Sequence, residues 1–322
     1  MRSLSKALTA LILSVSITAA LAQEYPSRQI HMVVGFAPGG ANDTIARFVA
    51  AELQSRLKQT VVVENRTGAG GTIGAALVSK SAPDGYTLYL GSTGTNAIGP
   101  TLYPKLPYDP VNGLAPISIV AKSGNLVVVP ADSPFKTVRE LVAYAKANPN
   151  KLNYGSSGNG STLHLAGEMF KEAAGVELTH VPYKGDAIAL TDLAAGQIQI
   201  TFSGIPPALS MARNGKARIL AVTSAERMPT LPDVPTVAES GVPGMNVSTW
   251  YGLFAAAGTP PAILERLSLE VKNIIEQPAF KEKLTGQGVV AVSSTPAEFR
   301  SFVKQEIDRW GKAVKAAKVT ID

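Results

Sequence analysis

Short apolar runs alternate along this chain with stretches in which apolar residues recur every three or four positions. The runs at residues 30–36, 60–64 and 86–90 are rich in β-branched and aromatic residues, which is typical of buried strands. Between the first two runs, four-residue spacing predicts a helix with one apolar face, formed by Ile45, Val49, Leu53 and Leu57. Asn42 or Asp43 is expected to cap this helix.

The same alternation continues in the second half of the chain. Strand-like runs at residues 178–183 and 198–202 flank a helical stretch at 186–195, and another helix is predicted at 161–174. Regular alternation of strands and helices is typical of α/β layers with mainly parallel sheets. The pattern therefore predicts an α/β fold.

Two segments are expected to cross between domains. Residues 117–129 contain two β-type runs split by residues 122–125, and the run at 249–255 provides the return crossing. Without its first 22 residues the chain has 300, which is more than one compact core usually holds. We predict one domain from residues 23–122 and 253–322, and a second domain from residues 123–252.

The first 22 residues have the pattern of a secretory signal peptide. Arg2 and Lys6 precede an apolar stretch at residues 7–21, and the sequence Ala20-Leu21-Ala22 is a small-x-small cleavage site. We expect cleavage after Ala22 and export of the mature protein. No later apolar run has the roughly 18 residues of a membrane span.

Composition excludes several classes of function. The formal charge of +6 falls to +4 when Arg2 and Lys6 are removed, and no basic cluster suggests a nucleic-acid partner. The chain has no cysteine, and its three histidines lie far apart, so we expect no metal site. A phosphate-binding P-loop is absent and no glycine loop matches a dinucleotide motif, so no cofactor is expected.

Three polar loops rich in glycine each follow a strand and precede a helix. They lie at residues 37–40, 91–96 and 156–160. In open α/β sheets, ligands bind beyond the carboxyl ends of the strands, where helices present free N–H groups to anions. No lysine or arginine lies between Phe36 and Arg47, so an anion at the first loop would be held mainly by neutral dipoles. The alternative is that these turns only connect elements.

The third loop carries several hydroxyl groups. Ser156, Ser157, Ser161 and Thr162 could hold a carboxylate, or Ser161 could simply cap the helix that follows. His164 lies one turn inside that helix, where a half-buried structural role is favoured. Trp250 and Tyr251, in the return crossing, could line the cleft, but packing at a hinge is favoured for both.

A hydrolase is weighed and not favoured. Residues 155–158 read Gly-Ser-Ser-Gly, which does not have the spacing of the nucleophile elbow G-x-S-x-G. Ser161, His164 and Asp186 could form a triad, but His164 follows Ser161 by three residues on one helix. In that position its ring cannot easily reach the hydroxyl and also hold a distant carboxylate.

Nine motifs follow one another along the mature chain. They are Tyr25-Pro26, VVGFAPGGAND (33–43), VENRTGAGG (63–71), PDGYTL (83–88), residues 154–161, VPYKG (181–185), LAVTS (220–224), DVPTVAE (233–239) and residues 252–260. In this order they resemble the Bug-type periplasmic solute-binding proteins of tripartite tricarboxylate transporters, and the resemblance covers essentially the whole mature chain.

The resemblance implies a two-domain Venus-flytrap fold, type II-like, with two crossing strands. It implies that a small carboxylate binds between the domains, without catalysis, to main-chain N–H groups, hydroxyls and waters. By motif, the implied ligand-binding residues are Phe36, Gly39, Gly40, Asp43, Ser92, Thr93, Asn96, Ser156, Ser157, Ser161, His164, Tyr183, Lys184, Phe202 and Ser203.

One position departs from the family pattern. The family commonly has Phe-Asp where this chain has Phe202-Ser203. Because that aspartate could accept a hydrogen bond from a ligand amino group, its absence favours a plain mono- or dicarboxylic acid over an amino acid.

The sequence therefore predicts a monomeric, non-enzymatic solute-binding protein that delivers a small carboxylate to membrane permease subunits. Two alternatives stay open at this point. One is an exported hydrolase, and the other is a binding module that signals to a sensor protein.

Overall fold

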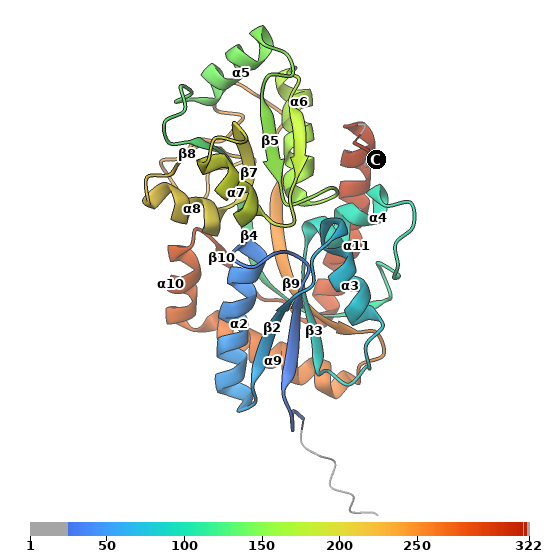
Figure 1. Cartoon of the computed structure of the whole chain (residues 1–322). Helices are drawn as coiled ribbons and strands as arrows, with labels where there is room; N and C mark the ends of the chain where they lie inside the picture. The colour runs from blue at the N-terminus through green and yellow to red at the C-terminus, as the bar shows by residue number, and fades with distance from the viewer. Residues whose placement is uncertain (1–24, 318, 321–322) are drawn as a thin grey trace, which may run out of the picture.

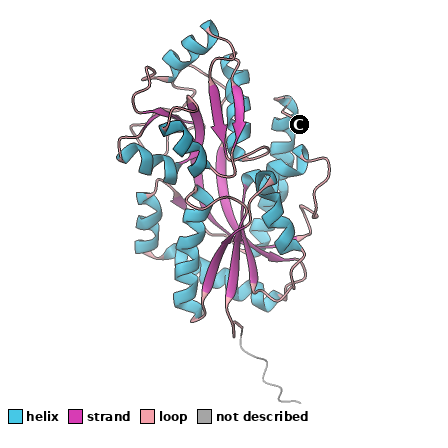
Figure 2. Ribbon diagram, in the orientation of Figure 1, coloured by secondary structure: helices cyan, strands magenta, loops and turns pink. Residues whose placement is uncertain are grey.

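The computed structural model describes residues 25–317 and 319–320 and shows two α/β lobes joined by two long strands (Figure 1). One sheet continues through both lobes in the order β2-β1-β3-β9-β4-β7-β5-β6, and β8 and β10 pair with β4 (Figure 2). The strands are β1 (Ile30–Val34), β2 (Val61–Asn65), β3 (Thr87–Ser92), β4 (Leu114–Pro130), β5 (Asn153–Ser156), β6 (Thr179–Pro182), β7 (Ile200–Gly204), β8 (Ala217–Val222), β9 (Ser248–Ala256) and β10 (Val290–Ala291).

Helices cover both faces of the sheet. They are α2 (Ala41–Leu57), η1 (Ala69–Gly71), α3 (Thr72–Ser79), η2 (Gly94–Ile98), α4 (Gly99–Leu102), α5 (Val138–Ala147), α6 (Thr162–Ala174), α7 (Asp186–Ala194), α8 (Ile205–Arg213), α9 (Pro261–Glu276), α10 (Pro278–Gly286) and α11 (Pro296–Ala316). No helix in the described part of the chain is long and apolar enough to cross a membrane.

The first lobe is built on the opening strand. β1 pairs in parallel with β2 and β3, so their carboxyl ends meet at one edge. The four predicted apolar residues of α2 are all buried against this sheet, as the four-residue spacing requires. In the second lobe, β5 pairs in parallel with β6 and β7, which brings the ends of those strands to the facing edge.

β4 and β9 connect the lobes. β4 pairs with β9 from Leu114 to Gly124, and from Asn125 onward it pairs with β7 and β8 of the second lobe. β4 runs without a break through residues 122–125, and the predicted crossing strand is confirmed. The polar residues Ser123 and Asn125 mark the change of lobe and are themselves buried.

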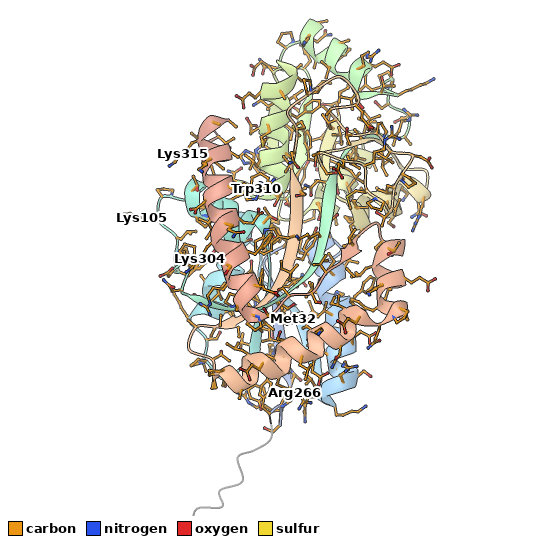
Figure 3. The ribbon with its side chains drawn as sticks, turned by 180° about the vertical axis from the view of Figure 1, so that it is seen from behind. Met32, Lys105, Arg266, Lys304, Trp310 and Lys315 are labelled. Carbon is orange, nitrogen blue, oxygen red and sulfur yellow. The ribbon has the colours of Figure 1, made fainter. Side chains whose placement is uncertain are left out.

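α11 packs behind the return crossing (Figure 3). The indole N–H groups of Trp250 on β9 and Trp310 on α11 both donate to Glu306 Oε2, at 3.1 and 2.9 Å. Trp250 also contacts the rings of Phe299 and Phe302. The hinge-packing role favoured for Trp250 is therefore confirmed.

Helix starts were predicted with mixed success. Ser161 caps α6, which is one of the two roles considered for it, and Thr137 forms a capping box with Glu140. The predicted cap of α2 by Asn42 or Asp43 was wrong, because α2 already begins at Ala41 with Gly40 as its N-cap. Asp43 instead accepts hydrogen bonds from the Gly39 N–H and from Arg47.

The two lobes are closed on each other. The Ala37 N–H of the first lobe donates to the Lys184 carbonyl of the second at 3.0 Å. The Tyr103 hydroxyl similarly reaches the Asn159 carbonyl at 2.7 Å. These bonds join loops at the facing edges, so the space between the lobes is enclosed.

Candidate ligand-binding site

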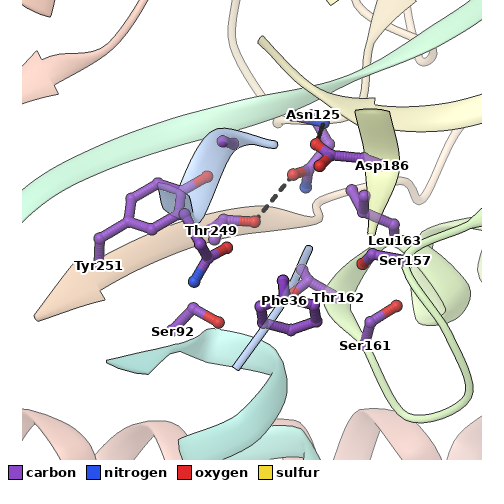
Figure 4. A pocket seen from close by; sticks show the side chains of 13 residues that line it. Phe36, Ser92, Asn125, Ser157, Ser161, Thr162, Leu163, Asp186, Thr249 and Tyr251 are labelled. Carbon is purple, nitrogen blue, oxygen red and sulfur yellow. Dashed lines mark hydrogen bonds between the residues drawn. The ribbon is translucent and has the colours of Figure 1, made fainter. Parts of the chain in front are cut away.

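A small cavity lies between the lobes, beside the crossing strands (Figure 4). We call it the inner cavity. Its volume is about 20 Å³, which is room for one water molecule. It is lined by Phe36, Ala41, Asn42, Ser92, Asn125, Ser157, Ser161, Thr162, Leu163, Asp186, Gly204, Thr249 and Tyr251.

The N-terminus of α6 forms one wall of the inner cavity. The Ser161 hydroxyl accepts the His164 N–H at 3.2 Å and so caps the helix. The two residues between them, Thr162 and Leu163, line the cavity, and N–H groups in a first turn have no partner within their helix. Ser157 and Ser161 add hydroxyl groups. This wall can bind an anion through dipoles and without a cation.

α2 contributes a further donor that sequence reasoning did not assign to the site. Asn42 lines the inner cavity, and its buried Nδ2 has no hydrogen-bond partner among the described residues. A buried amide N–H without a partner is unfavourable, so a ligand acceptor would satisfy it. The only signal in the sequence was the position of Asn42 at the start of the helix.

Asp186 is the single charged side chain that lines the inner cavity. Its Oδ2 accepts the Gly204 N–H at 3.1 Å. Burial raises the pKa of the Asp186 carboxyl to about 6, although backbone N–H groups of Gly204, Asp186, Ala41 and Ala187 favour the charged form. α7 therefore supplies a carboxylate beside the end of β7, where this chain has Ser203 in place of the aspartate common in the family.

The crossing strands form another wall. The Thr249 hydroxyl donates to Asn125 Oδ1 at 2.8 Å, which links β9 to β4 inside the cavity (Figure 4). Tyr251 also lines it, and burial followed by the negative charge of Asp186 raises the Tyr251 pKa. Packing alone had been favoured for Tyr251, and that interpretation was wrong. The sequence placed it on the crossing strand without indicating its face.

Four of the residues implied by the resemblance line the inner cavity, namely Phe36, Ser92, Ser157 and Ser161. Gly40 lies next to the lining residue Ala41 and faces Asp186.

Other implied residues of the first lobe lie just behind the cavity wall. Thr93 Oγ1 accepts the Trp250 N–H at 2.8 Å, and Asn96 Oδ1 accepts the Ser92 N–H at 3.2 Å. Gly39 donates to Asp43. Burial alone would raise the pKa of Asp43, but hydrogen bonds from Arg47, Gly39 and Asn65 lower it overall.

Implied residues of the second lobe are likewise used in internal contacts. Ser156 Oγ lies 2.7 Å from His180 Nε2, and the Ser203 hydroxyl donates to the Gly204 carbonyl. Phe202 packs on Tyr154. His164 stacks on His180, with ring centroids 4.3 Å apart, and burial lowers the His164 pKa. His164 therefore has the structural surroundings that were favoured for it.

Tyr183 and Lys184 line a second, larger cavity nearer the surface, which we call the outer cavity. The volume of the outer cavity is about 350 Å³. It is also lined by residues 68–71, Tyr103 and residues 157–159. Phe36 and Ser157 border both cavities. The two cavities are therefore adjacent.

The geometry does not assemble a hydrolytic triad from Ser161, His164 and Asp186. His164 Nδ1 accepts the Gly160 N–H at 3.3 Å, and the Asp186 carboxylate binds the Gly204 N–H. Among residues 25–317 and 319–320, no group of three or more His, Cys, Asp or Glu side chains could hold a metal ion.

Comparison with known proteins identifies the family. Residues 45–319 match the model of the tripartite tricarboxylate transporter family receptor. This chain belongs to that receptor family. The receptor is 37% identical over 295 residues to the protein BugT of Bordetella pertussis, covering 91% of this chain and 90% of BugT.

Solved structures agree with this assignment. The R. palustris protein Rpa4515 with adipate has a TM-score of 0.90 and 38% identity, covering 92% of the receptor and 99% of that chain. MatC from Rhodopseudomonas palustris with bound malate has a TM-score of 0.85 and 34% identity, and the match covers 90% of the receptor and 100% of MatC. These matches confirm the predicted two-domain periplasmic-binding-protein fold with two crossing strands. The family is one of extracytoplasmic receptors rather than enzymes.

Proposed function

We propose that this receptor captures a small organic carboxylate between its lobes and delivers it to the permease subunits of a tripartite tricarboxylate transporter. We further propose that it acts without catalysis, as a monomer in the periplasm, after cleavage behind Ala22. The observation that carries the proposal is a cavity between the lobes with the N-terminus of α6 in its wall and, among the described residues that line it, no lysine, arginine or histidine. The solved relatives with adipate and malate support a carboxylate ligand.

In this proposal the ligand carboxylate binds at the start of α6. The N–H groups of Thr162 and Leu163 and the hydroxyls of Ser157 and Ser161 would donate to it, and Asn42 would add its free amide N–H. Hydrogen bonds to a charged group contribute about 1.5–3 kcal/mol each, so a few of them suffice for firm binding.

The rest of the ligand would extend past Phe36 into the outer cavity. The inner cavity alone has room for about one water, which is too little for a whole organic acid. Tyr183 and Lys184 would then contact the far end of the ligand. The remaining implied residues would position these contacts from behind. They are Gly39, Gly40, Asp43, Thr93, Asn96, Ser156, His164, Phe202 and Ser203.

Closure would couple binding to recognition by the permease. A ligand that contacts α2 and Ser92 in one lobe and α6 in the other stabilises the closed form, because those contacts cannot all form when the lobes separate. We propose that the lobes pivot where β4 changes partners, between Gly124 and Asn125, and near Val247 on the return. The first point lies close to the boundary predicted at residue 122.

Calorimetry and thermal unfolding with a panel of organic acids test the proposal. One carboxylate should bind per chain, and ligand at 100 times its dissociation constant should stabilise the protein by about 2.7 kcal/mol. A sugar, a nucleotide and a divalent cation are the matched negative probes. If one of these stabilises the protein while every acid fails, the carboxylate assignment is wrong.

A further inference from the structure

An anion-binding cavity whose single charged lining side chain is a carboxylate needs a physical explanation. Asp186 would repel a ligand carboxylate unless something compensates its charge. None of the ion pairs found among the described residues includes Asp186. Asp186 is nevertheless only 5% exposed, and its partners are backbone N–H groups rather than a cation, so its buried negative charge is not neutralised.

The residues around Asp186 bind its carboxylate and leave space for it. Gly204 donates its N–H to Oδ2, and a Cβ on Gly204 would lie only 3.0 Å from the same oxygen. A Cβ on Gly40, across the cleft, would overlap Oδ1. Two glycines, one from each lobe, therefore leave the space that the carboxylate occupies.

The small size of the inner cavity limits what can lie between Asp186 and α6. Both line a space with room for about one water. A group that binds the α6 donors and a group that faces Asp186 must therefore be close neighbours in the ligand. The first must accept hydrogen bonds and the second must donate one.

We propose that Asp186 determines the ligand class, by selecting carboxylates that carry a hydrogen-bond donor on the carbon next to the carboxylate. This inference rests on the proposed function. The preferred donor is an ammonium group, as in a 2-amino acid, because it also supplies the positive charge that the buried carboxylate lacks. A 2-hydroxy acid binds less tightly, and an unsubstituted acid binds least.

Two matched sets of acids test this selection by calorimetry at pH 7.5. Succinate, malate and aspartate differ only in the group on one carbon, and so do propionate, lactate and alanine. In the set that fits the cavities, the amino acid should bind at least about tenfold more tightly than the unsubstituted acid, since one charged hydrogen bond accounts for that factor.

Replacement of Asp186 should remove the preference without removing binding. In Asp186→Asn, the ratio between amino acid and unsubstituted acid should fall below about threefold, and the unsubstituted acid should bind at least as well as before. Asp186→Ser is the second variant if the first does not fold. Asp308→Asn, an equal change of charge on the exposed face of α11, should leave the ratio unchanged.

The unmodified protein provides a test that needs no variant. The preference should weaken between pH 7.5 and pH 5 when each affinity is expressed for the ionised form of the acid, because a protonated Asp186 no longer attracts an ammonium group. Tyr251 is the other titratable residue in the lining, and its raised pKa keeps it neutral over this range.

Three results would overturn the inference. They are equal or tighter binding of the unsubstituted acids, a preference that survives in both Asp186 variants, and a preference that is the same at both pH values. Binding of acids without any preference would leave the proposed function intact. If no acid of either set and none of the wider panel binds, the proposed function fails as well.

Discussion

Gly40 and Asp186 face each other across the cleft so closely that a methyl group on Gly40 would overlap the Asp186 carboxylate. Gly40 is the N-cap of α2 in the first lobe, and Asp186 is the first residue of α7 in the second. The closed form therefore depends on the missing side chain at residue 40.

Gly40→Ala should weaken ligand binding by at least about tenfold, equivalent to about 1.4 kcal/mol, because the added methyl keeps the lobes from closing fully. The backbone of Gly40 has φ −77° and ψ 176°, which alanine adopts without strain, so the fold should be stable. Calorimetry measures the affinity and circular dichroism the fold. The double variant Gly40→Ala with Asp186→Ser should recover part of the closure, because the shorter side chain removes the overlap.

Gly39→Ala is the matched control for the neighbouring glycine. Gly39 has φ +83°, which alanine adopts at a cost of about 1–2 kcal/mol, whereas a Cβ there meets only Ala187 at 3.5 Å. The variant should lose stability in urea unfolding and close normally. An unchanged affinity in Gly40→Ala would show that this turn does no more than connect β1 to α2.

The hydroxyl groups at the start of α6 should matter more than the nearest cation. Ser157→Ala and Ser161→Ala should each weaken binding by about tenfold, because each removes a hydrogen bond to a charged group. Ser161→Ala should also cost about 1 kcal/mol of stability through the lost helix cap. Lys184→Met should have a smaller effect, since an exposed ion pair contributes about 0–1 kcal/mol.

Ser156→Ala is the control for these serine variants, since its hydroxyl contacts His180 and does not line the inner cavity. Affinity measured at low and high salt should change little, because short hydrogen bonds are screened less than exposed charges. A large loss in Lys184→Met with little loss in either serine variant would instead indicate a pocket that binds by charge.

Thr93→Val should destabilise the fold by about 1–3 kcal/mol, because it leaves the buried Trp250 N–H without an acceptor. Valine has the same shape as threonine, so the change in the free energy of unfolding measures the loss of the hydrogen bond between Thr93, just before η2, and Trp250 on β9. Urea unfolding measures it. Ser92→Ala, one residue earlier and in the cavity lining, should reduce affinity with little change in stability. The reverse pattern would mean that Thr93 contacts the ligand directly.

The pH dependence of stability should reveal Asp186. Burial raises its pKa from 3.8 to about 6 in the folded protein, so the native state binds more protons than the unfolded state between these values. The stabilising effect of this proton is complete below about pH 4 and is lost as the pH rises through about 6. The loss is on the order of 2–3 kcal/mol, at 1.36 kcal/mol per pKa unit.

Asparagine at residue 186 does not titrate, so Asp186→Asn lacks this loss of stability. The free energy of unfolding of the variant minus that of the unmodified protein should therefore rise from pH 4 to pH 7. Urea unfolding of both proteins without ligand, at several pH values, checks this. The comparison cancels the opposite pH dependence of carboxylates such as Asp43, whose pKa is lowered. A difference that stays constant or falls with pH would contradict a raised pKa at Asp186.

The sequence by itself determined the local elements of this protein. Strand and helix periods reflect which faces are buried, and that information is carried by neighbouring residues. The buried face of α2, the Ser161 cap and the capping box at Thr137 follow from such short-range patterns. The order of motifs added the family and, with it, Phe36, Ser92, Ser157 and Ser161 of the cavity lining.

Only the tertiary structure decided which side chains meet between the lobes. Asn42, Asp186 and Tyr251 come from α2, α7 and β9, and no local pattern links positions so far apart in the chain. Their meeting depends on strand pairing and on how far the lobes close, which many residues set together. The same dependence brings Asp186 close to Ser203, because the position of a carboxylate in space is fixed by packing and not by its place in a motif.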